Sequence, residues 1–433
     1  MKTTPASTPA STIGASTATP QARTMRRVVI ASSLGNGLEI YDFTVYSFFA
    51  VIIGQLFFPN DSALASLLMS LATFAVGFLM RPLGAVIIGR VADRCGRKAA
   101  LSLTIGLMTV GTGLIAFTPT YASIGITATA LLVFGRLLQG ISAGGEVGTA
   151  SAFLMESGRT DNRCFMVSWQ GASQGAAALL GALTGLLLTS NLTQEALHSW
   201  GWRVPFVIGL LIGPVGWYIR QHLDETHTAP HNPTPLAALL RTQGRTLVLG
   251  ILWMAAATVS MYMVVFYMPT YLVNTLHYPG TFAFALVGLA SALLAIIPPF
   301  AARYADRLAS RKTILYWTVC LPLVMVYPAF LLLGGQSTLL CMLAITLLVM
   351  PLAVGVGPSL AMMMEAFPRE QRVTGLSIIY SFGVTIFGGF SPLLVTWLIG
   401  VTGNPLTPAF YLIAACLVSL FALRLFPEHP GRD

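Results

Sequence analysis

Charge is scarce in this chain. Asp, Glu, Lys and Arg make up only 9% of its 433 residues, whereas 55% are hydrophobic. A soluble domain normally carries about 25% charged residues, so this composition excludes a water-soluble globular protein. Apolar runs recur along the whole length, and each reaches the roughly 18 residues that cross a bilayer of about 30 Å. We therefore predict an all-α membrane protein with many transmembrane helices.

Several other signatures are lacking. The five cysteines lie apart and form no C-x-x-C pair, which argues against a disulfide framework or a metal site. We find no phosphate-binding loop and no nucleophile–base pair, so we expect neither an enzyme nor a resident cofactor. The first 24 residues, rich in Ser, Thr, Ala and Pro, contain no apolar core of the signal-peptide type. We interpret residues 1–27 as a disordered cytoplasmic tail without a cleaved signal.

Glycine, proline and polar residues divide the rest of the chain into twelve apolar runs. We expect transmembrane spans near residues 28–56, 64–89, 100–117, 122–153, 164–190, 202–219, 246–273, 281–302, 313–333, 338–364, 373–399 and 407–426. With the N-terminus in the cytoplasm, 21 of the 24 Lys and Arg residues are cytoplasmic and only Arg203 is external. This bias predicts two cytoplasmic termini and an even number of spans. It also explains the net charge of +9 without a nucleic-acid partner.

The two halves of the chain repeat two short patterns. ADRCGRK at 92–98 returns as ADRLASRK at 305–312, with the aspartates 213 residues apart. A glutamate followed seven residues later by an arginine also recurs, with an offset of 209 residues. These landmarks indicate two six-helix halves related by a pseudo-two-fold axis along the membrane normal, a known transporter architecture. We expect an N-terminal bundle at 28–219, a cytoplasmic connector at 220–245, a C-terminal bundle at 246–426 and a cytoplasmic tail at 427–433.

The repeated motifs place acids and bases together at the cytoplasmic ends of helices. A carboxylate at one helix end can pair with arginines of a neighbouring loop in one conformation and release them in another. We predict a conformational gate of this kind; the alternative is that the basic residues serve only membrane topology. The candidates are Asp93, Arg94, Arg97, Glu156, Asp306, Arg307, Arg311, Glu365 and Arg372.

Five ionisable residues fall clearly inside the predicted spans, away from the span ends, and all are in the first half: Glu39, Asp42, Arg81, Arg136 and Glu146. Each costs roughly 2.5–3.5 kcal/mol near the bilayer centre, so such residues normally face a bundle interior or a water-filled cavity. Spans seven to twelve contain no acid or base away from their ends, and no histidine lies inside any span. We therefore expect charge chemistry in the first half, shape and neutral hydrogen bonds in the second, and no histidine relay.

The buried carboxylates are the candidates for holding a proton. At about 100° per residue, Glu39 and Asp42 share one face of the first span. An opposite charge favours the ionised form of a carboxylate, whereas burial disfavours it. A carboxylate alternately paired with Arg136 and left unpaired would take up and release a proton. The candidates, in order of preference, are Asp42, Glu39 and Glu146.

The two arginines suit an anionic cargo. Guanidinium is always charged and binds a carboxylate in a two-pronged geometry, so Arg136 and Arg81 favour a substrate with at least two carboxylates. The alternative is a structural pair with a neighbouring helix. Neutral candidates for hydrogen bonds to the substrate, each with packing as the alternative, are Asn36, Gln139, Gln170, Gln174, Thr258, Tyr262 and Tyr380.

Several stretches resemble a known family. GRVADRCGRKAAL (89–101) and GRLLQGISAGGE (135–146) resemble signatures of the major facilitator superfamily. GNGLEIYDF (35–43) and EAFPREQRVTGLSIIYSFGVTIFGGFSP (365–392) are similar to its metabolite:proton symporter branch, and the chain is most similar to the citrate and tricarballylate proton symporters. Two features depart from the family pattern: Ile40 replaces the usual Trp, and the second loop motif has one extra residue and no glycine.

The resemblance implies a twelve-helix major facilitator fold that imports citrate or tricarballylate with protons by alternating access, driven by the proton gradient. It also implies an inner-membrane location and a monomer. One alternative is a proton symporter of another organic acid or osmolyte: a dicarboxylate, shikimate or betaine. An exporter of cationic compounds is a second alternative, although Arg81 and Arg136 argue against it. A non-transporting sensor is the third.

Overall fold

The computed structural model describes residues 36–428 except Leu38, Gly96, Gly145, 222–235 and Gln336. Only the backbone is described at 89, 92–98, 101, 146, 149, 211–212, 215–221, 236–238 and 370. The predicted tail at 1–27, residues 28–35 of the first predicted span, residues 222–235 of the connector and residues 429–433 of the second tail therefore lie outside the described residues.

Helices of the first half follow the predicted spans. A helix over Glu39–Phe48 continues, after a bend of 68°, into α2 (Ala50–Phe57). The other helices are α3 (Ala63–Cys95), α4 (Arg97–Phe117), α5 (Tyr121–Ile124), α6 (Ile126–Ala143), α7 (Glu146–Ser157), α8 (Arg163–Asn191), α9 (Gln194–Ser199) and α10 (Val204–Gln221), with short turns η1 (Thr160–Asn162) and η2 (Gly201–Arg203).

The second half is helical in the same manner. Its helices are α11 (Leu236–Met261), α12 (Met268–Asn274), α13 (Gly280–Ala305), α14 (Arg311–Leu333), α15 (Thr338–Glu365), α16 (Arg372–Val384), α17 (Ser391–Thr402) and α18 (Thr407–Leu425). Single wider turns of π-helix, η3 (Tyr262–Phe266) and η5 (Thr385–Gly389), join α11 to α12 and α16 to α17, and η4 (Arg369–Gln371) precedes α16.

Among the described residues, nine helices are long and apolar enough to span a membrane, and the bent pair at Glu39–Phe57 makes a tenth. The predicted third and sixth spans correspond to α4, whose apolar part is Ser102–Phe117, and to α10. Each of the twelve predicted spans therefore has its helix or helix pair.

Besides the bent first span, three spans predicted as single helices are interrupted. The fourth divides into α6 and α7 beside Gly144, where a Cβ would lie 2.0 Å from the Arg81 carbonyl oxygen. In the seventh and eleventh, the π turns precede Pro269 and Pro392 in the first turn of the next helix. Proline has no N–H and crowds the preceding turn, so a wider turn relieves the clash. In addition, α11 begins at Leu236, inside the predicted connector.

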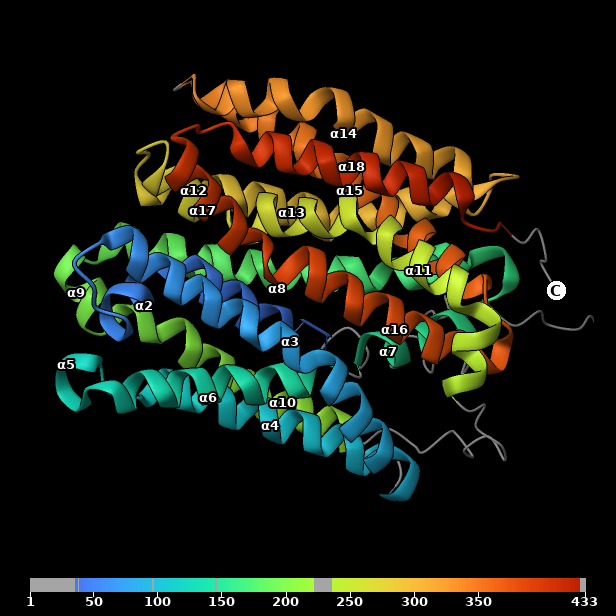
Figure 1. The fold of residues 1–433 in the computed structure, drawn as a ribbon, viewed down its shortest axis with the longest axis horizontal. Coiled ribbons are helices and arrows are strands. Elements are labelled where there is room, and N and C mark those ends of the chain that lie inside the picture. Colours follow the sequence, from blue (N-terminus) through green and yellow to red (C-terminus); the bar gives the residue numbers. More distant parts are fainter. Residues whose placement is uncertain are drawn as a thin grey trace, which may run out of the picture.

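The two halves lie against each other along two seams (Figure 1). In the picture α4, α6 and α10 form one side and α14 and α18 the opposite side, while α8 and α13 lie side by side between them. The second seam joins α3 to η5, α16 and α17. Small residues allow this approach: a Cβ on Gly175 of α8 would lie 2.3 Å from the backbone nitrogen of Ala295.

Candidate substrate and proton site

Four charged side chains meet inside the first half. Glu39 and Asp42 come from the first helix, Arg81 from α3 and Arg136 from α6, and none is more than 4% exposed. They face packed protein and not lipid, as the cost of charge in a membrane requires. Their burial agrees with the sequence-based expectation, and the roles assigned to them stay predictions.

Arg81 and Glu39 form a buried ion pair. Arg81 Nη2 donates to Glu39 Oε1 over 2.5 Å, and the guanidinium carbon lies 4.6 Å from the centre of the Phe78 ring and 5.1 Å from that of Phe43. The carboxylate and the ring faces together balance the charge of this arginine. The structural pair that the sequence left open for Arg81 is therefore present in this conformation.

Arg136 has a different environment. Its Nη1 donates to Gln139 Oε1 over 2.6 Å, and its guanidinium carbon lies 4.3 Å from the centre of the Tyr46 ring and 4.5 Å from that of Phe43. Its Nε and Nη2 have no hydrogen-bond partner among the described residues. These two donors form one edge of the guanidinium plane, the edge that a carboxylate binds with both oxygens.

Asp42 is linked to Arg136 only indirectly. Thr112 Oγ1 of α4 donates to Asp42 Oδ2, and Gln139 Nε2 donates to Thr112 Oγ1 over 2.9 Å. The sequence-based hypothesis has a carboxylate alternately paired with Arg136 and left unpaired, and in this conformation Asp42 and Arg136 form no direct ion pair among the described residues. The reason is helix orientation: Asp42 points toward α10, where a Cβ on Gly209 would lie 2.6 Å from Asp42 Oδ1.

Neutral polar residues form a second group on α8 and the first helix. Asn36 Nδ2 donates to Ser173 Oγ over 2.8 Å, and Gln174 Nε2 donates across the halves to Tyr380 Oη over 3.2 Å. Gln170 is 1% exposed, and its side-chain amide has no hydrogen-bond partner among the described residues. A buried amide with both ends unsatisfied is costly unless a ligand completes it, so this group suits a polar substrate.

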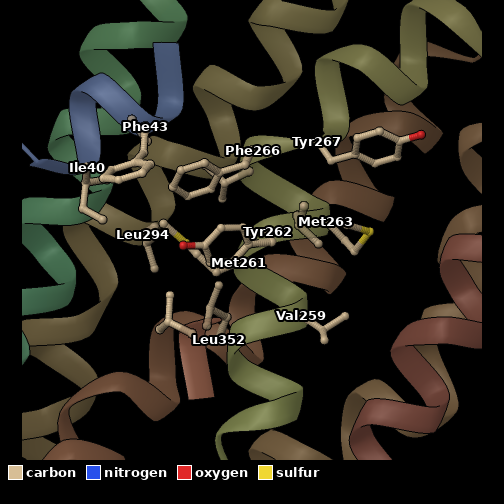
Figure 2. Close-up of a cluster of buried hydrophobic side chains, with 14 of the residues drawn as sticks. Ile40, Phe43, Val259, Met261, Tyr262, Met263, Phe266, Tyr267, Leu294 and Leu352 are labelled. Carbon is tan, nitrogen blue, oxygen red and sulfur yellow. The ribbon is translucent and has the colours of Figure 1, made fainter. Parts of the chain in front are cut away.

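An aromatic cluster closes the space between the halves. Figure 2 shows Phe43 of the first helix facing Phe266 and Tyr262 of η3. Tyr262 stacks on Phe266 with 4.7 Å between ring centres and lies 5.4 Å from Phe78. Thr258, one turn before Tyr262, contributes its methyl group beside Gly388.

Sequence reasoning missed two kinds of site residue. Phe74 and Phe78 contact the arginines, and their spacing of one helical turn, continued by Arg81, is a signal that would have found them. Thr112 carries no comparable signal, because one hydroxyl in an apolar span is common. The side chain of Glu146 lies outside the described part of the chain, so its proposed role stays a prediction.

Charged groups also meet where α8 begins and α15 ends. Glu365 binds Arg163 over 3.0 Å and Arg311, and so joins the first half to the second. Asp306 accepts from the backbone N–H groups of Cys164 and Phe165, both over 2.9 Å. Carboxylates are stabilised at a helix N-terminus, so Asp306 caps α8 across the boundary between the halves.

The other gate candidates are placed as follows. Arg372 Nε donates to the Phe367 carbonyl over 3.3 Å, and Glu156 lies in the last turn of α7. Arg307 lines a surface pocket of about 300 Å³ with Asp306, Asp161, Asn162, Phe165 and Arg303. The side chains of Asp93, Arg94 and Arg97 lie outside the described part of the chain. Arg163, not among the candidates from the sequence, forms an ion pair between the two halves with Glu365.

Two bundles of membrane-spanning helices with buried charges near their boundary define a membrane transporter. The family model for the Major Facilitator Superfamily matches residues 33–383, and the chain belongs to this superfamily. A crystal structure of a D-xylose-proton symporter superposes with a TM-score of 0.76 at 18% identity, covering 94% of this chain and 99% of the other. The predicted twelve-helix major facilitator fold is thereby confirmed, and the chain is a transporter without a cofactor and not an enzyme.

Curated relatives cover nearly the whole chain. It is 34% identical over 401 residues to a citrate-proton symporter of Klebsiella pneumoniae, covering 91% of this chain and 90% of that protein. It is 32% identical over 412 residues to a proline/betaine transporter of Escherichia coli (strain K12), covering 92% and 82% respectively. The resemblance seen in the motifs is therefore confirmed at the level of the family, while the two relatives differ in substrate.

Proposed function

We propose that this chain is a symporter that imports a tricarboxylate, citrate or tricarballylate, with protons by alternating access. The observation that carries the proposal is the buried guanidinium of Arg136, whose Nε–Nη2 edge has no partner among the described residues. A permanent positive charge with an unused two-pronged edge suits a carboxylate better than any neutral or cationic cargo. The citrate-proton symporter similar to this chain agrees with that chemistry.

Arg136 binds one carboxylate and Arg81 a second. Arg81 is held by Glu39 in this conformation, so it becomes available when Glu39 takes a proton and loses its charge. Hydrogen bonds from neutral polar side chains then complete the site. The candidates for these bonds are Asn36, Gln139, Gln170, Gln174, Thr258, Tyr262 and Tyr380. A tricarboxylate fits this inventory because its third carboxylate, and in citrate also the hydroxyl group, needs polar partners and not a third arginine.

Proton coupling belongs to the buried acids. Asp42 is the first candidate because its Oδ1 has no hydrogen-bond partner among the described residues while its Oδ2 accepts from Thr112. Glu39 follows because protonation breaks its ion pair with Arg81. Glu146 remains the third candidate on the sequence alone. The proton gradient supplies the energy for accumulating the substrate.

Alternating access requires each end of the central site to open in turn. On one side, Ser47 Oγ donates to the Phe266 carbonyl over 3.0 Å and ties the first helix to η3. At the other side, Glu365 and Asp306 tie α15 and α13 to α8. We propose that the second set is the cytoplasmic gate, completed by the remaining charged candidates, in a monomer of the bacterial inner membrane with both termini in the cytoplasm.

A second candidate function is uptake of a zwitterionic osmolyte, as the proline/betaine relative suggests. Quaternary ammonium groups are recognised by cages of aromatic rings. Here the rings of Phe43, Tyr46 and Phe74 already surround the guanidinium of Arg136, so the protein's own cation fills the cage. This observation favours the anionic substrate over betaine.

The test is uptake by purified protein in proteoliposomes under an imposed pH gradient. Labelled citrate is supplied, with tricarballylate, succinate, shikimate and betaine as competitors. We expect citrate accumulation that collapses with a protonophore and is competed most strongly by tricarballylate. Accumulation driven by a sodium gradient at constant pH contradicts proton coupling, and stronger competition by betaine contradicts the tricarboxylate assignment.

A further inference from the structure

The two key charges of the first half lie on different helices and are joined by two uncharged side chains. We propose that Gln139 and Thr112 are positioning residues that transmit the occupancy of Arg136 to Asp42, so that binding of the substrate anion and uptake of the proton are coupled through them. This inference rests on the proposed function for its substrate, but the link itself is a property of the side chains.

The hydrogen bonds of this link all run in one direction. Arg136 Nη1 donates to Gln139 Oε1 over 2.6 Å, and Gln139 Nε2 donates to Thr112 Oγ1 over 2.9 Å. Thr112 in turn gives its single hydroxyl hydrogen to Asp42 Oδ2. Each donor therefore points from the cation toward the carboxylate, and each bond polarises the next.

Close packing holds the four side chains of this link in place. Arg136 and Gln139 are 0% exposed, Thr112 is 1% and Asp42 is 4% exposed. A Cβ on Gly111 would lie 2.7 Å from Gln139 Cγ, so the glycine lets α4 approach α6 closely enough for the two side chains to meet. Gly209 leaves the corresponding space for Asp42. In a site buried this deeply, electrostatic effects are strong and a polar group that loses its partner is costly.

The sign of the coupling follows from the charges. When no substrate is bound to Arg136, its positive charge stabilises the ionised form of Asp42 through the polarised hydrogen bonds of the link. A substrate carboxylate on the Nε–Nη2 edge neutralises that charge and weakens the support, which favours a proton on Asp42. By thermodynamic reciprocity, the proton favours the substrate anion to the same extent. A buried positive charge and a buried negative charge joined in this way produce symport.

The link is tested without substrate by infrared titration of the purified protein, in which the band of the protonated Asp42 carboxyl is identified by its loss in Asp42→Asn. Thr112→Val keeps the shape but removes the donor to the ionised carboxylate. We expect its titration midpoint to move to higher pH by about one unit or more. Gln139→Leu should move it in the same direction by interrupting the chain. Thr112→Ser should restore the wild-type midpoint.

A second arm measures transport in proteoliposomes. Thr112→Val should retain citrate exchange at equal pH but accumulate roughly tenfold less citrate under a pH gradient, and Thr112→Ser should recover accumulation. The matched control is Thr109→Val on the same helix, because Thr109 is not one of the residues in the hydrogen-bonded link. Recovery by serine separates loss of the hydroxyl from altered packing.

The outcomes keep the two proposals apart. An Asp42 band that titrates identically in wild type, Thr112→Val and Gln139→Leu overturns the link. Equal defects in Thr112→Val and Thr112→Ser overturn it as well, because packing and not the hydroxyl is then responsible. A wild-type protein that takes up no tricarboxylate overturns the proposed function, and the infrared arm still decides the link.

Discussion

At the scale of the residue, each buried charge is balanced by a different chemistry. Glu39 and Arg81 neutralise one another, Arg136 lies among aromatic rings, and Asp42 accepts a hydroxyl hydrogen bond. Charges in the bilayer are costly, so each retained one needs a local partner. The aromatic rings beside Arg136 and the hydroxyl group beside Asp42 carry no permanent charge. Arg136 can therefore bind a substrate anion, and Asp42 can bind a proton, without first breaking an ion pair.

Replacing Arg136 by lysine tests the two-pronged contact. Arg136→Lys keeps the charge but loses the planar edge, so we expect the affinity for citrate to fall roughly 10–100-fold. Equilibrium binding of labelled citrate to purified protein measures it. The matched control is Arg245→Lys on the exposed surface of α11. Unchanged affinity in Arg136→Lys rules out a bidentate contact.

Replacing Asp42 by asparagine tests the coupling site. Asp42→Asn cannot bind and release a proton, so we expect citrate exchange to persist while accumulation under a pH gradient is lost. Both rates are measured in the same proteoliposomes. Asp61→Asn, at an exposed carboxylate, is the control and should behave as wild type. If uphill uptake survives intact in Asp42→Asn, the coupling proton resides elsewhere.

At the scale of the element, helix ends carry the contacts between halves. The first turn of α8 is bound by Asp306, and Arg163 at its start is bound by Glu365 from the end of α15. Interactions at helix termini combine the charge of the side chain with the partial charge of the helix end. We expect a small rotation of one half to separate these contacts together, as the proposed gate requires.

Opening of this gate is measurable at a native cysteine. Cys164 is 0% exposed beneath the contact, and Gly357 of α15 packs against its carbonyl oxygen. Glu365→Gln removes the charge shared by Arg163 and Arg311, so we expect Cys164 to react about tenfold faster with a membrane-permeant maleimide, the change given by about 1.4 kcal/mol.

Peptide mass spectrometry locates the label at Cys164, and Glu195→Gln at an exposed acid distant in sequence serves as the control. Labelling of Cys164 at the wild-type rate in Glu365→Gln shows that this carboxylate does not hold the gate closed.

At the scale of the whole molecule, the two halves are held by close backbone contact along α8 and α13. Gly175 brings α8 against the backbone of Ala295, whereas Gly288 on α13 has nothing within 4 Å of where its Cβ would lie. Close contact of small residues supplies the packing that lipid cannot supply. In the proposed alternating-access mechanism, this seam is the expected axis about which the halves rock.

Adding one methyl group tests this seam. Gly175→Ala forces a Cβ against backbone that has no freedom to move, so we expect a loss of about 1–3 kcal/mol in stability. The measurement is thermal unfolding in detergent. Gly288→Ala should be neutral or stabilising, because alanine has the higher helix propensity and meets no neighbour. Equal melting temperatures for Gly175→Ala and wild type contradict the tight seam.

Local pattern alone determined much of this protein. Long apolar runs specify membrane helices because such runs are stable in the lipid bilayer and not in water. The repeated loop motifs indicate two similar halves. The positions of the charges inside spans also follow from the sequence, since each interrupts a long apolar run. The prolines at 269 and 392 were visible too, but the π turns before them were not predicted, because a proline specifies strain and not the way in which the turn relieves it.

Only the tertiary structure decided which groups meet. Asp42 and Arg136 share no direct bond, and Thr112, 27 residues from Gln139 in the chain, stands in the path between them. Glu365 likewise binds Arg163 from the other half, 202 residues away. The identity of a residue sets what it can bind, but the partner it takes depends on how helices distant in sequence rotate and pack, and ångström-scale differences in that packing are not encoded in any local pattern.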